Sequence, residues 1–171
     1  RTETQAFLEN PTQKVDLIVP RGGEQLIAFV KQHANCPVIV SGRGNNFVYI
    51  DAEADIDTAL KVIINGKTAK ISACNAVDKV LINNAIPNKK EVVETLIAEL
   101  QKFNVEILGD ESLTSFDNVA PIEDEHTWYE EFLDYKIVIG SVSSTEEAIS
   151  KINTYGGRHS AYIITKNNNT A

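Results

Sequence analysis

The sequence predicts an α/β protein, because short apolar runs of strand length alternate with segments whose apolar residues recur at helical spacing. The clearest case is the run VDLIVP at residues 15–20, which leads through Arg21-Gly22-Gly23 into a helical pattern at residues 24–34. A strand that passes through a glycine turn into a helix is typical of this class. Six more runs of strand length follow along the chain, and helical patterns separate most of them.

In the first half of the chain we expect three strands and a second helix. The strands are predicted at residues 15–20, 36–42 and 46–54, each a short apolar run. The second helix, over residues 55–71, is predicted from one apolar face that carries Ile56, Ala59, Leu60, Ile63 and Ile64. Asp55 is expected to cap its start and Gly66 to weaken its far end.

The second half continues the alternation. Asn88 and Glu91 are spaced like a capping box, in front of a helix whose apolar face carries Val92, Val93, Leu96, Ile97, Leu100 and Phe103. Ser144 and Glu147 form another capping box, for a helix with Ala148, Ile149, Ile152 and Tyr155 that Gly156-Gly157 should end. Residues 109–127 are acidic and turn-rich, so we expect an exposed loop there. Strands are predicted at residues 76–82, 105–108, 136–143 and 161–165.

The composition argues against several classes of function. The 171 residues include 24 acidic and 16 basic ones, and a formal net charge of -8 repels nucleic acid and anionic membranes. No apolar run approaches the roughly 20 residues of a membrane span, and nothing indicates a signal peptide. Cys36 and Cys74 have no C-x-x-C spacing, which favours reduced thiols and a cytoplasmic location. Because the chain begins with Arg1 and contains no methionine, we interpret it as a piece of a longer protein.

Cys74 is the sharpest candidate for chemistry. It follows a predicted helix, and its small neighbours Ser72, Ala73 and Asn75 would allow a substrate and backbone N–H groups to approach closely. Lys67 and Lys70 could favour its thiolate if they face it. The alternative is a structural thiol, which is the commoner fate of a cysteine, and core packing is the interpretation that we prefer for Cys36.

Other motifs carry less information. Arg21-Gly22-Gly23 could hold phosphate at a helix start or be an ordinary tight turn. The stretch GRGNNF lacks the third glycine of a dinucleotide fingerprint, and a strand follows it. His33, His126 and His159 are scattered without ligand spacing, so we expect no metal site. Trp128 and Tyr129 are expected to anchor the acidic loop beside them.

Five segments together resemble the gamma-glutamyl phosphate reductase family, which belongs to the aldehyde dehydrogenase superfamily. They are DLIVPRGGEQLI (16–27), VYIDAEADIDTALKVIINGKT (48–68), SACNAVDKVLI (72–82), EFLDYKIVI (131–139) and AISKINTYGGRHSAYIIT (148–165). They stand in the order of the family and span nearly the whole chain. The segment around SACNA, preceded by NGKT, is the most specific of them.

This resemblance implies a domain organisation and a set of site residues. Residues 1–42 would be the C-terminal end of a cofactor-binding domain, and residues 43–171 a truncated catalytic domain built on an incomplete three-layer α/β/α sheet. Cys74 would be the catalytic nucleophile, and Glu131 would contact the nicotinamide ribose. Gly22 and Gly23 fall where the superfamily places the cofactor phosphates, and no metal is implied.

The resemblance also implies a reaction. Cys74 would attack L-glutamyl 5-phosphate, phosphate would leave, and hydride from NADPH would reduce the thioester to L-glutamate 5-semialdehyde, in proline biosynthesis. The implied partners are this small-molecule substrate, further copies in a homo-oligomer and the preceding glutamate kinase, with no nucleic acid and no membrane. Two alternatives stay open: another acylating or aldehyde-oxidising enzyme with the same cysteine, and a catalytically inactive domain that serves assembly.

Three departures from the superfamily's patterns bear on this reaction. Val40 stands where aldehyde-oxidising members have the glutamate that activates water, and valine cannot act as a base. A reductase that exchanges phosphate does not need that base. The stretch GRGNNF replaces GDGICH, and Ala69-Lys70-Ile71 replaces QRP before the cysteine loop, so activity or cofactor preference could differ.

Overall fold

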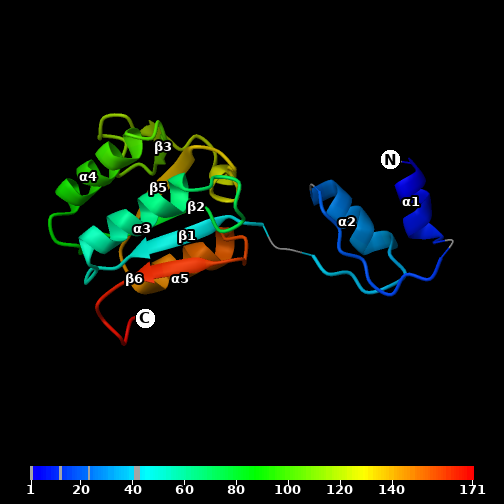
Figure 1. Ribbon diagram of the computed structural model, residues 1–171. Helices are drawn as coiled ribbons and strands as arrows, with labels where there is room; N and C mark the ends of the chain where they lie inside the picture. Colours follow the sequence, from blue (N-terminus) through cyan, green and yellow to red (C-terminus); the bar gives the residue numbers. More distant parts are fainter. Residues whose placement is uncertain (1, 12, 23, 41–42) are drawn as a thin grey trace. The chain divides into compact units, whose positions relative to one another are not determined.

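The computed structural model describes residues 2–11, 13–22, 24–40 and 43–171. The chain divides into two compact units, Arg1–Ser41 and Gly42–Ala171. Each unit is drawn in Figure 1 and is described by itself below. The larger unit holds the strands of the sheet and Cys74, so it carries most of the argument about function.

The smaller unit contains two helices, α1 (Thr2–Glu9) and α2 (Glu24–His33). The strands predicted at 15–20 and 36–42 are wrong over their described residues, since these runs share only one parallel bridge, between Ile18 and Val38. The physical reason is exposure: Leu17, Val19 and Ile39 point to solvent, so the apolar runs are not buried strands. Helix α1 was not predicted, and residues 41 and 42 lie outside the described residues.

The larger unit is built on a six-stranded sheet with the order β4-β3-β5-β2-β1-β6, and every described strand pair is parallel. Its strands are β1 (Asn46–Ile50), β2 (Val77–Asn83), β3 (Glu106–Gly109), β4 (Ala120–Pro121), β5 (Lys136–Val142) and β6 (Ala161–Ile164). The short strand β4 lies inside the segment predicted as an acidic loop, where Leu113 is also buried. That segment is therefore packed in part against the sheet.

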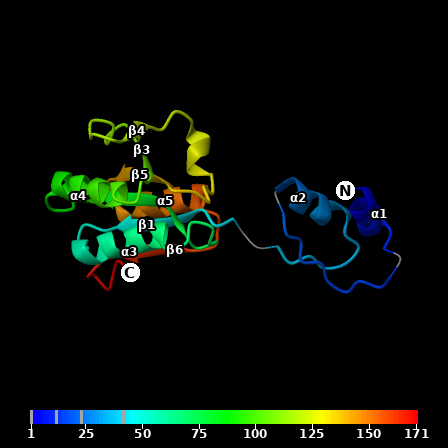
Figure 2. The ribbon, with the colours of Figure 1, turned by 45° about the horizontal axis from the view of Figure 1, so that its top comes forward.

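Helices cover both faces of this sheet, as Figures 1 and 2 show. On one face α3 (Ile56–Thr68) and α4 (Lys89–Gln101) pack on Val48, Ile50, Val80, Ile82, Ile137 and Ile139. On the other face α5 (Thr145–Tyr155) and the 3-10 helix η1 (Glu125–Trp128) pack on Phe47, Tyr49, Leu81, Leu108 and Val138. Because successive strand residues point to opposite faces, one sheet builds both cores. The predicted three-layer arrangement is confirmed.

Most of the predicted helix starts are confirmed, with one exception. Asp55 caps α3 by accepting a 2.9 Å hydrogen bond from Thr58 N–H, and Ser144 caps α5 by accepting one of 3.2 Å from Glu147 N–H. The capping box at Asn88 is wrong: Asn88 has a φ of 53°, and its side chain makes no capping bond. Phe103 and Ile149, predicted on apolar faces, are exposed.

The parallel arrangement decides where sites can form. Since all six strands run the same way, the segments that precede them meet at one edge of the sheet, which we call the amino edge, and the segments that follow them meet at the carboxyl edge. The Cys74 loop precedes β2, Glu131 lies before β5, and residues 157–160 lie before β6. These segments therefore meet at the amino edge despite their separation in sequence.

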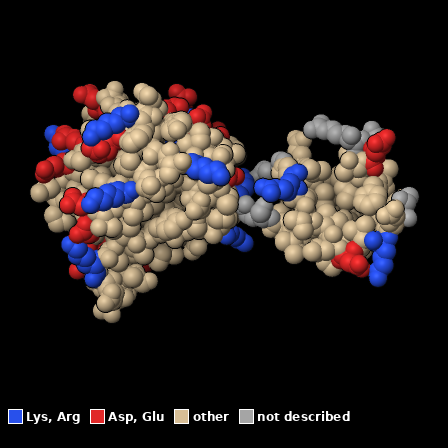
Figure 3. Space-filling view, in the orientation of Figure 1, with Lys and Arg blue, Asp and Glu red and all other residues tan. Residues whose placement is uncertain are grey.

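The surface of the larger unit is charged with both signs. On the face that Figure 3 shows, lysine and arginine side chains lie among aspartate and glutamate side chains. This mixed pattern on the visible face agrees with the low expectation of nucleic-acid binding that the net charge of -8 gives.

Candidate active site

Cys74 lies in a turn between α3 and β2, where its side chain is exposed as a free thiol. Two backbone bonds shape the turn, from Ala73 N–H to the carbonyl of Lys70 (3.1 Å) and from Ala76 N–H to the carbonyl of Ala73 (2.9 Å). The turn is thus held by its own backbone, and the sulfur stays open to a reactant from solvent.

Asn46, the first residue of β1, ties this turn to the sheet. Its buried side-chain amide donates to the carbonyl oxygens of Cys74 and Ala76, both at 2.8 Å, and also to that of Gly44. Its own oxygen accepts a 2.6 Å hydrogen bond from Ser160, just before β6. One buried side chain therefore joins the segments in front of three neighbouring strands.

Gly44 brings Cys74 and Glu131 together. A side-chain Cβ at Gly44 would collide with the carbonyl oxygen of Cys74 and with Oε1 of Glu131. The backbone of Gly44 therefore lies directly against both groups, and only glycine fits between them. Two residues that the resemblance assigned to one site thus lie at the same place in the structure.

The stretch that carries Gly44 also packs against the segment before β6. A Cβ at Gly157 would collide with the carbonyl of Arg43, and Gly157 N–H donates to the carbonyl of Asn45 at 3.2 Å. The backbone of the stretch GRGNNF therefore packs closely against the segment before β6. Gly44 and Gly157 each avoid a collision that a side chain at that position would cause.

Asn45 connects the same stretch to an aromatic cluster. Its side-chain nitrogen donates to the carbonyls of Trp128 (2.7 Å) and Tyr155 (2.8 Å). Trp128 is buried, and its ring packs with those of Phe47 and Tyr155, so its predicted role as an anchor is confirmed. The hydrogen bond from Tyr155 to Glu125 raises the pKa of Tyr155 to about 12.

Buried ionisable side chains lie in the elements on both sides of the Cys74 turn, at the end of α3 and the start of β2. Lys67 and Asp78 form a fully buried ion pair with 2.9 Å between Nζ and Oδ1. Lys79 is also buried, and desolvation lowers its pKa to about 7. The ammonium of Lys67 is enclosed and paired with Asp78, so it is not exposed to solvent, and its effect on the Cys74 thiolate stays a prediction.

The remaining candidates lie in the smaller unit. Gly22 is exposed with a φ of 156°, two residues before α2, while Gly23 lies outside the described residues. Val40 is half-buried near the end of the same unit. Their assignment to the cofactor or to the reaction stays a prediction.

No three His, Cys, Asp or Glu side chains among the described residues come together as a metal ion would require. Within the described part of the chain, no helix is long and apolar enough to cross a membrane.

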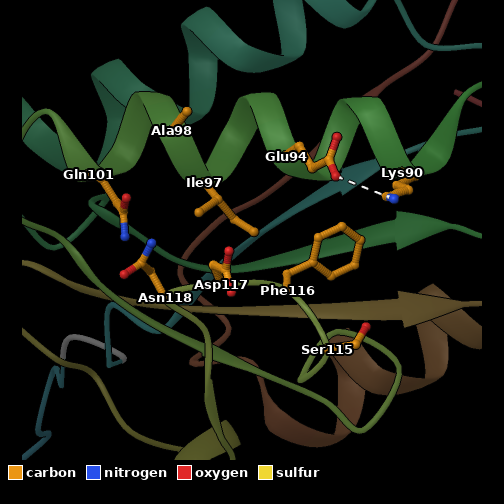
Figure 4. Close-up of a pocket in the computed structure, with 9 residues that line it drawn as sticks. All are labelled: Lys90, Glu94, Ile97, Ala98, Gln101, Ser115, Phe116, Asp117 and Asn118. Atoms are coloured by element: carbon orange, nitrogen blue, oxygen red, sulfur yellow. Dashed lines mark ion pairs between the residues drawn. The ribbon is translucent and has the colours of Figure 1, made fainter.

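A hollow elsewhere on the unit is a poor candidate for this chemistry. Figure 4 shows it between α4 and residues 115–118, with a volume of about 640 Å³. Lys90 and Glu94 on its rim pair with each other at 3.7 Å, and both are exposed. Neither Cys74 nor Glu131 is among its described lining residues, so we place the site at the amino edge instead.

Sequence reasoning missed Gly44, Asn46, Asp78 and Lys79. A signal existed for Asp78 and Lys79, since the predicted strand AVDKVLI contains two adjacent charged residues, which would need partners if the strand were buried. No comparable signal marked Asn46, because asparagine before a strand is common in turns.

Comparisons with known proteins find relatives over most of the chain. The model of the family described as acyl-CoA reductase (LuxC) matches residues 2–148. The gamma-glutamyl phosphate reductase of Lachnospira eligens is 44% identical over 158 residues, which are 92% of this chain and 37% of that protein. The chain thus spans well under half the length of the curated relatives that it matches.

Solved structures agree with these sequence relatives. The crystal structure of gamma-glutamyl phosphate reductase from Thermotoga maritima matches with a TM-score of 0.90 at 36% identity, over 99% of this chain and 40% of that one. The NADP complex of NADP-dependent glyceraldehyde-3-phosphate dehydrogenase from Bacillus halodurans matches with a TM-score of 0.73 at 18% identity, over 98% of this chain and 43% of that one. The second likeness shows the fold alone. The predicted fold class and the predicted resemblance are both confirmed.

Proposed function

The chain belongs to the acyl-CoA reductase (LuxC) family, and on this premise we propose that it is the cysteine-bearing part of a gamma-glutamyl phosphate reductase. The observation that carries the proposal is that the main-chain carbonyl of the exposed Cys74 and the carboxylate of Glu131 both lie against the backbone of Gly44. The identity of 44% to a gamma-glutamyl phosphate reductase supports the choice of substrate. In the proposed organisation, residues 1–42 end a cofactor-binding domain and residues 43–171 belong to the catalytic domain.

The proposed reaction uses Cys74 as the nucleophile. Its thiolate attacks the acyl carbon of L-glutamyl 5-phosphate, the carbon–oxygen bond to phosphate breaks, and a thioester forms. NADPH supplies the hydride that reduces this thioester, and the carbon–sulfur bond of the resulting thiohemiacetal then breaks. The products are L-glutamate 5-semialdehyde, phosphate and the regenerated thiol.

The backbone of the turn is suited to stabilise the oxyanion of this reaction. No acceptor among the described residues takes the N–H of Cys74, whereas its carbonyl is held by Asn46 at 2.8 Å. The Asn46 bond fixes the peptide group between Cys74 and Asn75, while the Cys74 N–H, in the preceding peptide group, is free to donate to a negative charge that develops beside the sulfur. We assign the Cys74 N–H as one oxyanion donor.

Glu131 suits the ribose of a nicotinamide cofactor. A carboxylate accepts hydrogen bonds from a pair of hydroxyl groups, and one oxygen of Glu131 is held against Gly44, next to the carbonyl of Cys74. Glu131 would therefore hold the ribose near the reacting cysteine. The NADP complex of the Bacillus halodurans dehydrogenase supports a nicotinamide cofactor for this fold.

Val40 supports reduction over oxidation. A hydrolytic member of the superfamily needs a base to activate water, and valine at this position offers none. The thioester would then persist until hydride reaches it, which favours a reductase.

The decisive experiment uses the full-length protein that contains this chain. Phosphate-dependent reduction of NADP⁺ by glutamate 5-semialdehyde measures the proposed reaction in reverse. We expect Cys74→Ala to lower this rate at least about 1000-fold, and Cys36→Ala to leave it within about twofold. A Cys74→Ala variant that keeps a tenth of the wild-type rate would refute the nucleophile assignment.

A second function is favoured by the family model, whose description is acyl-CoA reductase. The same cysteine could take its acyl group from a CoA thioester, with CoA in place of phosphate as the leaving group. Assaying acyl-CoA, glutamyl phosphate and free aldehyde in parallel separates the two. Faster NADPH oxidation with acyl-CoA than with glutamyl phosphate would select this alternative.

The remaining parts of the proposal concern the setting of the enzyme. We place it in the cytoplasm, as a homo-oligomer that receives its labile acyl phosphate from the preceding glutamate kinase. If the full-length protein binds no NADPH yet forms a stable oligomer, an inactive assembly role replaces the enzyme proposal.

A further inference from the structure

We propose that Asp78 and Lys79 are positioning residues, which hold Glu131 beside Cys74 by binding the peptide groups on both sides of Glu131. This inference rests on the proposed function, in which Glu131 binds the cofactor ribose. It assigns a purpose to two buried charged residues that the reaction itself does not use.

The starting point is an irregularity in β2. Asn46 pairs with Val77 and the next residue, Phe47, pairs with Lys79, so Asp78 is an extra residue in a β-bulge. A bulge at the start of a strand redirects a side chain from its regular face. Here it lets two consecutive side chains, Asp78 and Lys79, both reach the segment around Glu131.

Each of these side chains forms a hydrogen bond with the backbone of one neighbour of Glu131. The N–H of Phe132 donates to Oδ2 of Asp78 at 3.3 Å, and Nζ of Lys79 donates to the carbonyl of Glu130 at 2.8 Å. The Lys79 ammonium also lies 3.8 Å from the centre of the Phe132 ring, within cation–π distance. With both flanking residues fixed, the Cα of Glu131 has little freedom, and its carboxylate is directed at Gly44.

Lys67 completes the arrangement from α3. Oδ1 of Asp78 binds Lys67 at 2.9 Å, while Oδ2 accepts from the N–H of Phe132. One carboxylate oxygen thus bonds to α3 and the other to the segment around Glu131. Asp78 is itself buried, and a buried carboxylate without a cation would be costly. The ion pair therefore gives the buried Asp78 side chain a partner and holds it in place.

The cost of this arrangement argues for a purpose. Lys67 and Lys79 are both fully buried, and replacing buried ionic groups by apolar ones of similar size is often neutral or stabilising. Stability alone gives no reason for three buried ionisable side chains at the end of α3 and the start of β2. A rigid link between β2, which begins just after Cys74, and the Glu131 segment gives one.

The test is a double-mutant cycle in the full-length enzyme between Lys79→Met and Glu131→Gln. Methionine keeps most of the length of the side chain but loses the donor to Glu130. In the direction of reduction, we expect Lys79→Met to raise KM for NADPH about tenfold or more and to leave KM for L-glutamyl 5-phosphate within about twofold. In the Glu131→Gln background, Lys79→Met should add less than about twofold, because there is no carboxylate left to position.

Lys136→Met is the matched control. Lys136 also approaches the Phe132 ring, at 5.5 Å, but it pairs with Glu106 at 3.3 Å and has no described bond to residues 130–132. Its replacement should leave KM for NADPH within about twofold. Independent, multiplicative effects of Lys79→Met and Glu131→Gln would overturn the proposal.

A second readout separates this inference from the proposed function. In the 171-residue chain, amide exchange of Phe132 should become at least about tenfold faster in Lys79→Met, with β1 and β2 amides unchanged. If Glu131→Gln leaves KM for NADPH unaltered, the ribose role of Glu131 fails, and Phe132 exchange still decides whether Lys79 holds the segment. Unchanged exchange at Phe132 would overturn the positioning role.

Discussion

The two edges of the sheet both carry polar side chains, but these side chains bind different partners at each edge. At the amino edge, Asn46 binds backbone carbonyls of the Cys74 turn, and the thiol remains exposed. At the carboxyl edge, side chains bind one another: Lys89 donates to Ser141 at 2.6 Å, and Ser112 lies 2.6 Å from Asp110. The amino edge therefore leaves a thiol exposed to solvent, whereas these polar side chains of the carboxyl edge bind one another.

In a second hydrogen-bond network at the carboxyl edge, the polar side chains also bind one another. The hydroxyl of Tyr49 accepts from Asn83 at 2.7 Å, and it lies 3.1 Å from the hydroxyl of Thr145 and 3.2 Å from Asp51. Burial is the main reason that the pKa of Tyr49 is raised. These groups are already bonded to one another, so they offer little to a ligand.

This difference reverses the usual placement of sites in open α/β sheets. Ligands in such folds commonly bind beyond the carboxyl ends of the strands, where loops diverge to opposite faces. Here the candidate chemistry lies at the amino ends, in the segments that enter β1, β2 and β5. The fold class alone therefore does not decide where a site lies. In this protein the site lies at the edge where a reactive side chain is exposed.

The largest expected effect on stability compares one lysine at each edge of the sheet, the buried Lys79 and the half-buried Lys89. Burial lowers the pKa of Lys79 from 10.5 to about 7, with smaller effects from Asp78, Lys67, Glu130 and Lys136. Between these pH values the unfolded chain binds a proton that the folded chain does not, so stability rises with pH. We expect the free energy of unfolding to gain about 3 kcal/mol from pH 7 to 9.5 relative to Lys79→Met.

Urea titrations of both chains at the two pH values measure this difference. Trp128 is the single tryptophan and lies in the larger unit, so its fluorescence reports the unfolding of that unit. Lys89→Met is the comparison at the carboxyl edge. Burial also lowers the pKa of Lys89, although Asp110 opposes the shift, so the same sign with a smaller gain is expected. An equal pH dependence in wild type and Lys79→Met would contradict the prediction.

The next effect compares two buried asparagines at opposite ends of the sheet. Asn46→Ala leaves the carbonyls of Gly44, Cys74 and Ala76 without their donor, and we expect a loss of about 2 kcal/mol in the free energy of unfolding. Asn83→Ala removes the bond to Tyr49 and should cost about 1 kcal/mol. In the full-length enzyme, kcat/KM should fall about 100-fold for Asn46→Ala only. A similar fall for Asn83→Ala would remove the functional distinction between the edges.

A smaller effect on stability than that of Asn46→Ala is expected at glycines of the two edges. Gly44→Ala places a Cβ against the Cys74 carbonyl and Glu131, and we expect a cost of about 1.5 kcal/mol with a clear loss of activity. Gly109→Ala meets the side chain of Val119 at 2.5 Å and the Cβ of Leu113 at 3.0 Å, with its nearest backbone contact at 3.7 Å, so we expect a smaller cost than at Gly44. Chemical denaturation and kcat/KM of both variants check this prediction. Full activity in Gly44→Ala would show that the contact between these groups is dispensable.

Much of the larger unit could be predicted from the sequence, because its periodic apolar pattern is also its burial pattern. The helix that starts at Asp55 and the strand after Cys74 form where they were expected. The same reasoning failed at residues 15–20, where an apolar run remains exposed and forms only one bridge. It failed at Asn88 as well, because a left-handed backbone turns the side chain away from the helix start.

By itself the sequence determined the fold class, the strands of the sheet other than β4 and a cysteine in a turn of small residues. These depend on local periodicity and on short-range turn chemistry, which neighbouring residues contain. Only the tertiary structure decided that Cys74 and Glu131 meet at Gly44, that Lys67 is enclosed, and that the amino edge is the open one. The physical reason is that a parallel sheet gathers the starts of strands far apart in sequence, and that a buried charge is tolerated only where a distant segment supplies its partner.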